Sequence, residues 1–260
     1  TGYTGMVNEQ KRMDVIANNL ANSATTGYKK EGMVNQSFDH ELAIKIKDTS
    51  NYNIPQRIGS ISLGVKVGET YTNWDQGSFQ ITENMSDLAL SGEGYFAIAF
   101  TSKNGETSIK YTRDGAFSVD NAGYLRTSDV DYVLNRNGAL NSDDAPANYV
   151  RVNPDQEYKI DEQGFIYQND QVIDRIGVVR FADNNYVSKY GENLYNLVPG
   201  GQVLASDASV EQGCLEASNV NVIDEMVDMI TVARAYEAGQ KVIQTEDSTL
   251  DKAVNSVGQV

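Results

Sequence analysis

Residues 222–257 read VIDEMVDMITVARAYEAGQKVIQTEDSTLDKAVNSV. Positions in this stretch that are separated alternately by four and three residues are apolar, apart from Gln240 and Asp247. This spacing predicts a long helix with an apolar seam that pairs with another helix. The seam consists of Val222, Met226, Met229, Ala233, Tyr236, Gln240, Ile243, Asp247, Leu250, Val254 and Val257. Asn221 is the expected N-cap of this helix, with Asp224 and Glu225 in its first turn.

The N-terminal end of the chain repeats the pattern. Its seam positions are Tyr3, Met6, Gln10, Met13, Ala17 and Leu20, and the polar residues 22–27 predict the end of the helix at a glycine. We expect the two terminal helices to pair as a coiled coil. A helical hairpin that packs on its own domain is the alternative.

The energetics of an isolated terminal helix are unfavourable. Nine apolar seam side chains contribute about 1.5–3 kcal/mol each when fully buried. Ordering roughly 36 backbone residues costs about 1–2 kcal/mol each. We therefore expect the helices to become ordered only against each other and against neighbouring molecules.

The composition and charge of the chain exclude some classes of function. The chain has 260 residues, of which 40% are hydrophobic and 22% charged, and its formal net charge is −15. This charge argues against nucleic-acid binding, because such affinity depends on Lys and Arg replacing counterions. No stretch approaches the roughly 18 apolar residues of a membrane span, and no signal peptide is evident. The chain begins at Thr1 without a methionine, so we expect a few natural residues to precede it.

The middle of the chain has the pattern of β-structure. Residues 28–83 read as an extended connector, in which Ile61, Leu63, Val65 and Val67 alternate in the period of one short strand, and a turn at 74–77 leads into another strand. Residues 84–210 carry short apolar runs that are separated by turn signals. The turn signals include Asn104-Gly105 and the similar segments at 120–123 and 161–164. No segment there has helix-length periodicity. The prediction is an α+β fold: paired terminal helices (1–27 and 211–260) and a central antiparallel β-domain.

Several residues are candidates for chemical sites. Gly92 and Gly94 lack the third glycine and the following helix of a phosphate loop, so we interpret them as a turn. His40 is the only histidine, and with no matched nucleophile or second ligand it reads as a surface residue rather than a base. Residues 141–144 lack the ligand spacing of a calcium loop. Cys214 is the only cysteine, which excludes an intramolecular disulfide, and we interpret it as a small apolar side chain rather than a reactive thiol. The sequence therefore predicts no catalytic, cofactor-binding or metal-binding residues.

Motifs throughout the chain carry a family resemblance. The runs MDVIANNLAN at 13–22 and TGYK at 26–29 resemble the N-terminal signature of bacterial flagellar rod and hook proteins. SGEGYF at 91–96 and YTRDGAF at 111–117 look like the central domain of that family, and LEASNVNV at 215–222 with RAYE at 234–237 resembles its C-terminal segment. The length resembles the rod proteins rather than the longer hook protein. The stretch at 64–68 resembles the distal rod branch, and a proximal rod branch is the close alternative.

The resemblance implies a structural subunit of the flagellar basal-body rod, with no enzymatic activity and no cofactor. It implies a homo-oligomer in a helical filament, in contact with other rod and hook subunits and, where present, ring or bushing proteins. It also implies passage through the flagellar export apparatus without a cleaved signal peptide. Neither nucleic-acid binding nor membrane insertion is expected.

We expect an assembly interface on the terminal helices. Its residues are Met6, Met13, Ala17, Asn18, Asn19, Leu20, Asn22, Met226, Met229, Ala233, Tyr236, Ile243, Leu250 and Val254. Asn18, Asn19 and Asn22 are expected to hydrogen bond to adjacent protomers, with plain helix capping as the alternative. Gln10, Gln240 and Asp247 either fix the register of the seam or lie exposed at its edge. The competing function is a secreted β-rich adhesin or binding module that oligomerises through its terminal helices.

Overall fold

The computed structural model describes residues 2–37, 40–45, 56–62, 64–102, 105–191 and 193–257. It divides into two compact units. The first contains both terminal helices and the connector, as Thr1–Ala21, Glu31–Asn73 and Val220–Val260, and the second contains Asn22–Lys30 and Trp74–Asn219. The fold is α+β, as expected: an N-terminal helix, a β-rich central region and a C-terminal helix.

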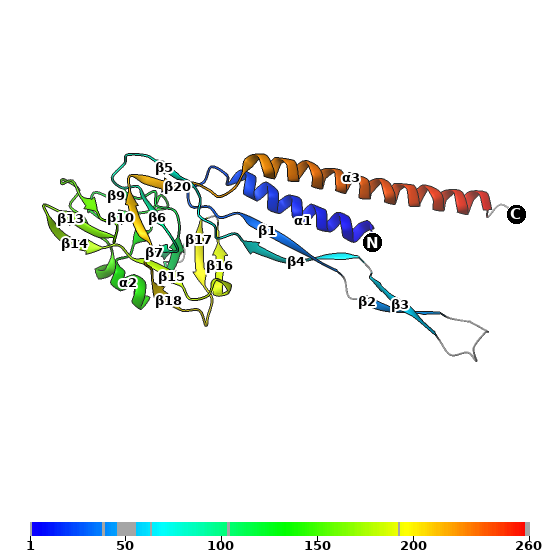
Figure 1. Cartoon of the computed structure of the whole chain (residues 1–260), viewed down its shortest axis with the longest axis horizontal. Helices are drawn as coiled ribbons and strands as arrows, with labels where there is room; N and C mark the ends of the chain where they lie inside the picture. Colours follow the sequence, from blue (N-terminus) through cyan, green and yellow to red (C-terminus); the bar gives the residue numbers. More distant parts are fainter. Residues whose placement is uncertain are drawn as a thin grey trace. The chain divides into compact units, whose positions relative to one another are not determined.

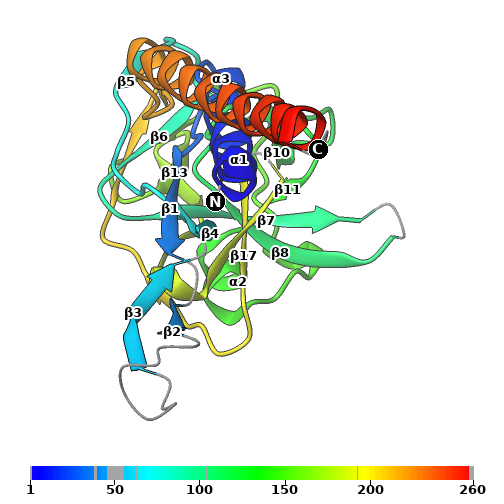
Figure 2. The ribbon, with the colours of Figure 1, turned by 90° about the vertical axis from the view of Figure 1, so that its right-hand side faces the viewer.

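The terminal helices of the first unit lie side by side (Figures 1 and 2). Helix α1 spans Gly2–Ala21, and α3 spans Val222–Lys252 before a π-helical turn, η3, at Ala253–Val257. Gly2 lies against Ile243 and Gly239 lies against Met6, whereas Asn19 of α1 hydrogen bonds to Glu225 of α3. Residues nearer the C-terminus of α1 therefore contact residues nearer the N-terminus of α3. The two helices therefore run antiparallel.

The ends of the helices follow the sequence signals. The Asn221 side chain accepts a hydrogen bond from the Ile223 N–H at 3.1 Å, which is the expected N-cap of α3. Helix α1 ends at Ala21, and the following polar segment reaches Gly27, whose φ of +68° is left-handed. Apolar periodicity and capping chemistry thus located both helices.

The face of α3 turned toward α1 differs from the predicted seam. Its least exposed positions also alternate by four and three: Glu225, Met229, Val232, Tyr236, Gly239 and Ile243. Met229, Tyr236 and Ile243 of the predicted seam are among these positions, and Ala233 is half-buried beside them, whereas Met226 and Gln240 are exposed. The reason is that a glycine at 239 and a polar contact at Glu225 set the register, and an apolar pattern detects neither.

Helix α1 also differs from its predicted seam. Tyr3, Gln10 and Ala17 of the predicted seam are exposed, whereas Asn8, Ile16 and Asn19 are buried. Because α1 also packs against the strands β1 and β4, its covered surface is broader than one coiled-coil seam. Two of the three buried residues are asparagines, so apolar periodicity could not identify this face.

The connector forms two antiparallel ribbons (Figure 1). Strand β1 (Glu31–Ser37) pairs with β4 (Val65–Thr72), and β2 (His40–Lys45) pairs with β3 (Gln56–Ser62). The single strand predicted across 61–67 is therefore two strands. The break comes at Gly64, whose φ of +138° ends the extended run, and Leu63 lies outside the described residues.

The second unit is built on one large sheet. Its strands follow the order β16-β17-β8-β7-β11-β10-β9, with β15 pairing with β7 and β18. Three smaller sheets, β12-β13-β14, β19-β6 and β20-β5, accompany it. The strand bounds are Phe79–Ile81 (β5), Leu88–Ser91 (β6), Tyr95–Thr101 (β7), Thr107–Thr112 (β8), Ser118–Val119 (β9), Leu125–Arg126 (β10), Tyr132–Val133 (β11), Lys159–Ile160 (β12), Phe165–Gln168 (β13), Gln171–Arg175 (β14), Val178–Phe181 (β15), Val187–Tyr190 (β16), Leu194–Leu197 (β17), Val203–Ala205 (β18), Ser209–Gln212 (β19) and Cys214–Glu216 (β20).

Strand β7 is the centre of this unit. Phe96 and Ile98 point into one apolar cluster with Leu88, whereas Tyr95 and Ala97 point into a second cluster on the opposite face. A strand buried on both faces is a continuous apolar run rather than an alternating one, which explains the sequence YFAIAF. The predicted antiparallel β-domain is confirmed.

Two of the predicted tight turns have the same geometry. Gly123 N–H donates to the Asp120 carbonyl and Gly164 N–H to the Asp161 carbonyl, both at 2.9 Å. Each aspartate side chain also accepts two backbone N–H groups of its own loop. Asn104 of the predicted turn at 104–105 lies outside the described residues.

The structure also contains elements that the sequence did not predict: helix α2 (Arg136–Asn141) and the 3₁₀ turns η1 (Pro146–Asn148) and η2 (Asn184–Tyr186). They are too short to produce a helical period.

Candidate functional site

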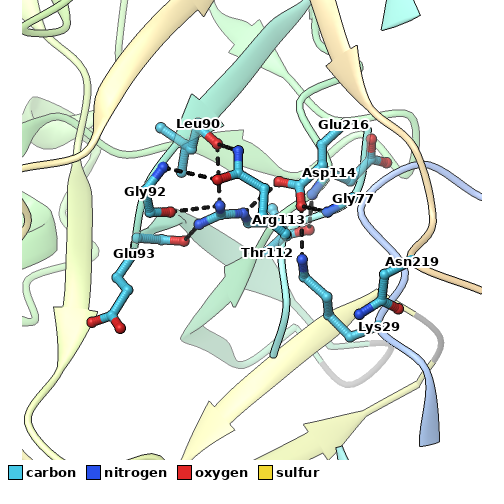
Figure 3. Close-up of polar contacts among 12 residues, drawn as sticks. Lys29, Gly77, Leu90, Gly92, Glu93, Thr112, Arg113, Asp114, Glu216 and Asn219 are labelled. Atoms are coloured by element: carbon cyan, nitrogen blue, oxygen red, sulfur yellow. Dashed lines mark hydrogen bonds and ion pairs between the residues drawn. The ribbon is translucent and has the colours of Figure 1, made fainter. Parts of the chain in front are cut away.

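A buried ionic node lies in the second unit where four segments of the chain meet (Figure 3). It consists of Lys29, Arg113 and Glu216, whose side chains are 2%, 5% and 1% exposed. One Glu216 carboxylate oxygen accepts from Lys29 Nζ at 2.7 Å, and the other accepts from Arg113 Nε at 2.6 Å. The backbone N–H of Gly77 also donates to this carboxylate, at 2.9 Å.

The Arg113 guanidinium organises the loop after β6. Its Nη2 donates to the carbonyl oxygens of Leu90 at 3.1 Å and Gly92 at 2.6 Å, and its Nη1 donates to that of Gly94. The 92–94 loop therefore presents carbonyl oxygens to a cation. A phosphate loop presents N–H groups, so the interpretation of these glycines as a turn is supported.

The node carries two cations and one anion in an interior position. Backbone carbonyls offset the additional positive charge, including that of Asp75, which accepts from Lys29 Nζ at 2.7 Å. Burial lowers the pKa of Lys29, and the hydrogen bond and charge of Glu216 oppose this shift. Three donors hold the Glu216 carboxylate, so the node joins the segments that carry Lys29, Gly77 and Arg113.

The N-terminal segment is fastened beside the node. Thr26 Oγ1 donates to Asp114 Oδ1 at 2.6 Å, and the Gly27 N–H donates to the Glu216 carbonyl at 2.8 Å. A Cβ at position 27 would lie 2.5 Å from the Asp114 nitrogen, so glycine is required there by close approach as well as by its φ. Residues 26–29 are thus an integral part of the β-rich unit.

The three asparagines near the end of α1 have different surroundings. Asn19 is buried, donates to the Glu31 carbonyl at 2.8 Å and to Glu225 at 3.2 Å, and accepts from the Glu31 N–H at 2.9 Å. Asn22 is buried and accepts from Thr25 Oγ1 at 3.3 Å. Asn18 is exposed. Contacts within the chain therefore account for Asn19 without a neighbouring protomer.

The other predicted assembly residues divide into covered and exposed groups. Half-buried within the single chain are seven of them: Met6, Met13, Leu20, Met229, Ala233, Tyr236 and Ile243. Ala17, Met226, Leu250 and Val254 are exposed. The structure brings Met6 and Ile243 to the contact between the two helices, and leaves Leu250 and Val254 beyond the last residue that faces α1.

A second apolar surface lies on α3 away from α1. This outer face consists of Ile223, Met226, Val227 and Ile230, which are 72%, 48%, 58% and 54% exposed. Their spacing of three, one and three residues places them on one side of two helical turns. Sequence analysis identified only Met226 of this group, because a single seam was sought on a helix that has two apolar faces.

The remaining chemical candidates were His40 and the segment 141–144. His40 lies in β2 opposite Ser62, and its side chain lies outside the description. Asn141 ends α2, and Asp143 caps the following Ala145 N–H. Among the residues that the structure describes, no cluster of His, Cys, Asp and Glu fits a metal ion, and no helix is long and apolar enough to span a membrane.

The ionic node itself was missed as a unit. Lys29, Arg113 and Glu216 each lie inside a motif that carried the family resemblance, but 84 and 103 residues separate them along the chain. Charged residues at such separations give no local signal. An available clue was that each of these motifs contains a charged residue next to aromatic, apolar or small residues.

Three family models match the chain. They are described as "Flagella basal body rod protein" (residues 1–29), "Flagellar hook protein FlgE/F/G D1 domain" (residues 89–168) and "Flagellar basal body rod FlgEFG protein C-terminal" (residues 211–256). The ionic node takes one residue from each matched region: Lys29, Arg113 and Glu216. These matches indicate a structural protein of the flagellar hook and rod class.

Similar full-length proteins agree. The flagellar basal-body rod protein FlgG of Bacillus subtilis is 34% identical over 98% of this chain and 97% of its own. That of Borreliella burgdorferi is 32% identical over 98% and 96%, and the rod protein FlgF of Caulobacter vibrioides is 30% identical over 100% and 97%. The chain belongs to the flagellar basal-body rod protein family and is a structural subunit of the basal-body rod.

Proposed function

We propose that this chain polymerises into a helical tube that forms the rod, and specifically its distal part. The tube transmits torque from the motor to the hook and contains the export channel. The terminal helices pair as a coiled coil on the inside of the tube, and the β-domain faces outward. Identity reaches 34% with an FlgG protein and 30% with an FlgF protein, which supports the distal position, and the proximal rod is the alternative. The proposal divides the chain into an N-terminal rod-core helix (1–27), an extended connector (28–83), a central β-domain (84–210) and a C-terminal rod-core helix (211–260).

The outer face of α3 carries the proposal. Fully burying four such side chains contributes about 1.5–3 kcal/mol each, and these are already half covered, so about 3–6 kcal/mol remains available for a partner. One such contact barely offsets the entropy of association. A filament, in which every subunit repeats the contact with several neighbours, uses it effectively, whereas an isolated chain leaves it in water.

The proposed assembly also specifies the partners of the chain and its route of export. Other rod and hook subunits are the axial neighbours, ring or bushing proteins surround the tube where present, and the flagellar export apparatus delivers the chain without a cleaved signal peptide. Helices that order only on arrival suit a chain that is threaded unfolded. Torque transmission requires many contacts per subunit and no catalytic group.

The test uses basal bodies from a strain that lacks this chain. Electron microscopy should show an interrupted rod, which the wild-type chain restores and an Ile223→Asp/Ile230→Asp variant does not. A Val172→Asp variant is the matched control, because Val172 is 53% exposed on β14 rather than on α3. Complete rods with the α3 variant would contradict the role given to the outer face of α3. Discrete oligomers together with normal basal bodies in the deleted strain would favour the adhesin alternative.

A further inference from the structure

The tip of the β10–β11 hairpin presents an exposed valine in an unfavourable backbone conformation. Val130 has a φ of +72° and is 60% exposed. Its N–H donates to the Thr127 carbonyl at 3.0 Å, and the Thr127 N–H donates to the Asp131 carbonyl at 2.9 Å, which defines a three-residue loop. The last position of such a loop is left-handed and suits glycine or asparagine, whereas a β-branched residue is strained there. A strained residue whose side chain is largely exposed suggests a use outside the chain.

A cleft of about 270 Å³ lies elsewhere in the same unit and is lined by aromatic and charged residues. Its apolar wall includes Trp74, Tyr95 and Phe181, with ring centroids 6.0 Å apart for Trp74 and Tyr95 and 4.9 Å apart for Tyr95 and Phe181. Arg180 also lines it and is exposed. Within the described part of the chain, the Arg180 guanidinium has no hydrogen-bond or ion-pair partner. Glu93 also lines the cleft and is exposed. The cleft therefore offers an aromatic wall and an unpaired Arg180 guanidinium beside a carboxylate.

The valine tip and the cleft lie at opposite ends of one strand. Tyr95, at the start of β7, lines the cleft, and the N–H of Thr101, at its end, donates to Asp131 beside the tip at 3.2 Å. Six residues of extended strand separate them by about 20 Å. A contact between the tip of one copy and the cleft of another would therefore be head-to-tail and would leave one tip and one cleft free. Such a heterologous contact propagates into an open filament.

Charge also favours a second copy as the occupant. Asp129 is exposed immediately before Val130, so the tip combines an apolar side chain with a carboxylate. On a chain of net charge −15, the free guanidinium of Arg180 is an uncommon partner for that carboxylate. We propose that the Val130 tip of one subunit inserts into the Trp74 cleft of the next, with Val130 against the aromatic wall and Asp129 paired with Arg180. The proposal rests on the proposed function as a self-assembling subunit and adds a specific contact between β-domains.

Substitution at the tip separates folding from assembly. Val130→Gly removes the side chain and relieves the left-handed backbone, so the isolated subunit should have a higher melting temperature while polymerising at least tenfold less by sedimentation. Val172→Thr, on an equally exposed but unstrained valine, should change neither. Asp129→Arg and Arg180→Glu should each weaken polymerisation, and the double variant should recover it to within threefold. A tip variant that assembles normally, or a double variant no better than its parents, would overturn the contact.

Cross-linking in assembled rods identifies the occupant. Val130→Cys and Asn184→Cys, the latter in the cleft, are combined in a Cys214→Ser chain. Basal bodies should then give a ladder of disulfide-linked multimers, and either cysteine alone should give none. Rods that contain only monomeric double-cysteine chains would overturn the contact and leave the proposed function intact. If the wild-type chain itself is absent from basal bodies, the proposed function fails as well.

Discussion

Glu216→Gln is the most informative perturbation of the ionic node. It preserves the size of the side chain and removes the one negative charge that Lys29 and Arg113 share. Both cations are at most 5% exposed, so solvent cannot replace the lost carboxylate. The variant therefore holds two buried positive charges without a counter-ion.

The expected loss is large. Removing one partner of a buried ion pair lowers the free energy of unfolding by about 3–5 kcal/mol. A typical domain has about 5–15 kcal/mol in total, so the variant should remain folded but be strongly destabilised. Urea unfolding of the full chain, followed by circular dichroism, should show a lower midpoint with an unchanged slope for the β-domain transition.

Lys29→Met is the matched control. It leaves Arg113 and Glu216 as a neutral buried pair and removes a cation whose charged form burial already disfavours. Its cost should be about 1–2 kcal/mol, mainly from lost hydrogen bonds. Adding Lys29→Met to Glu216→Gln should recover part of the stability, because it removes one of the two uncompensated charges.

The pH dependence provides an independent check. The folded-state pKa of Lys29 lies below its unfolded value, so the unfolded chain binds more protons between the two values. The Lys29 contribution to stability therefore increases as pH rises through that interval. Without Glu216 the pKa falls further, so the stability gap between variant and wild type should narrow in alkaline solution. A gap that is constant with pH, or a loss below about 1 kcal/mol, would refute this account of the node.

Three further predictions concern the helices, the termini and a second buried acid. Met229→Asp and Ile243→Asp place an unpaired charge on the α1-facing side of α3, so rod assembly should fail while the β-domain unfolds at its normal midpoint; normal rods with both variants would contradict the paired-helix proposal. Limited proteolysis of the dilute monomer should remove the ends and spare roughly residues 75–210, and mass spectrometry showing intact termini would count against assembly-coupled ordering. Burial raises the pKa of Asp131, so stability is lost as pH rises from its usual value to the raised one. Asp131→Asn, which still accepts from the Thr101 N–H, should raise the melting temperature at pH 7 and lose this advantage in acid; a lower melting temperature at pH 7 would show that the charge is needed.

The sequence was most informative where structure depends on local signals. Asn221 predicted the start of α3, the aspartates at 120 and 161 with their glycines predicted matched turns, and the apolar run of β7 predicted a strand. Each of these depends on residues that are close along the chain. Periodicity likewise located both terminal helices within a few residues.

Prediction failed where distant segments decide the outcome. The phase of the seam depends on Gly239 accommodating Met6 and on Asn19 bonding to Glu225, and no apolar pattern contains that information. The ionic node joins charges from three motifs that are at least 84 residues apart. The proposed assembly residues remain a prediction, because their test requires a second copy of the chain.

A cryo-electron microscopy map of basal bodies that contain this chain tests the central claim directly. The account predicts that α1 and α3 of every subunit line the inside of a helical tube, with the outer face of α3 covered by neighbouring subunits and the β-domain outside. Rods in which the terminal helices lie apart, or in which Ile223 and Ile230 face solvent, would contradict it.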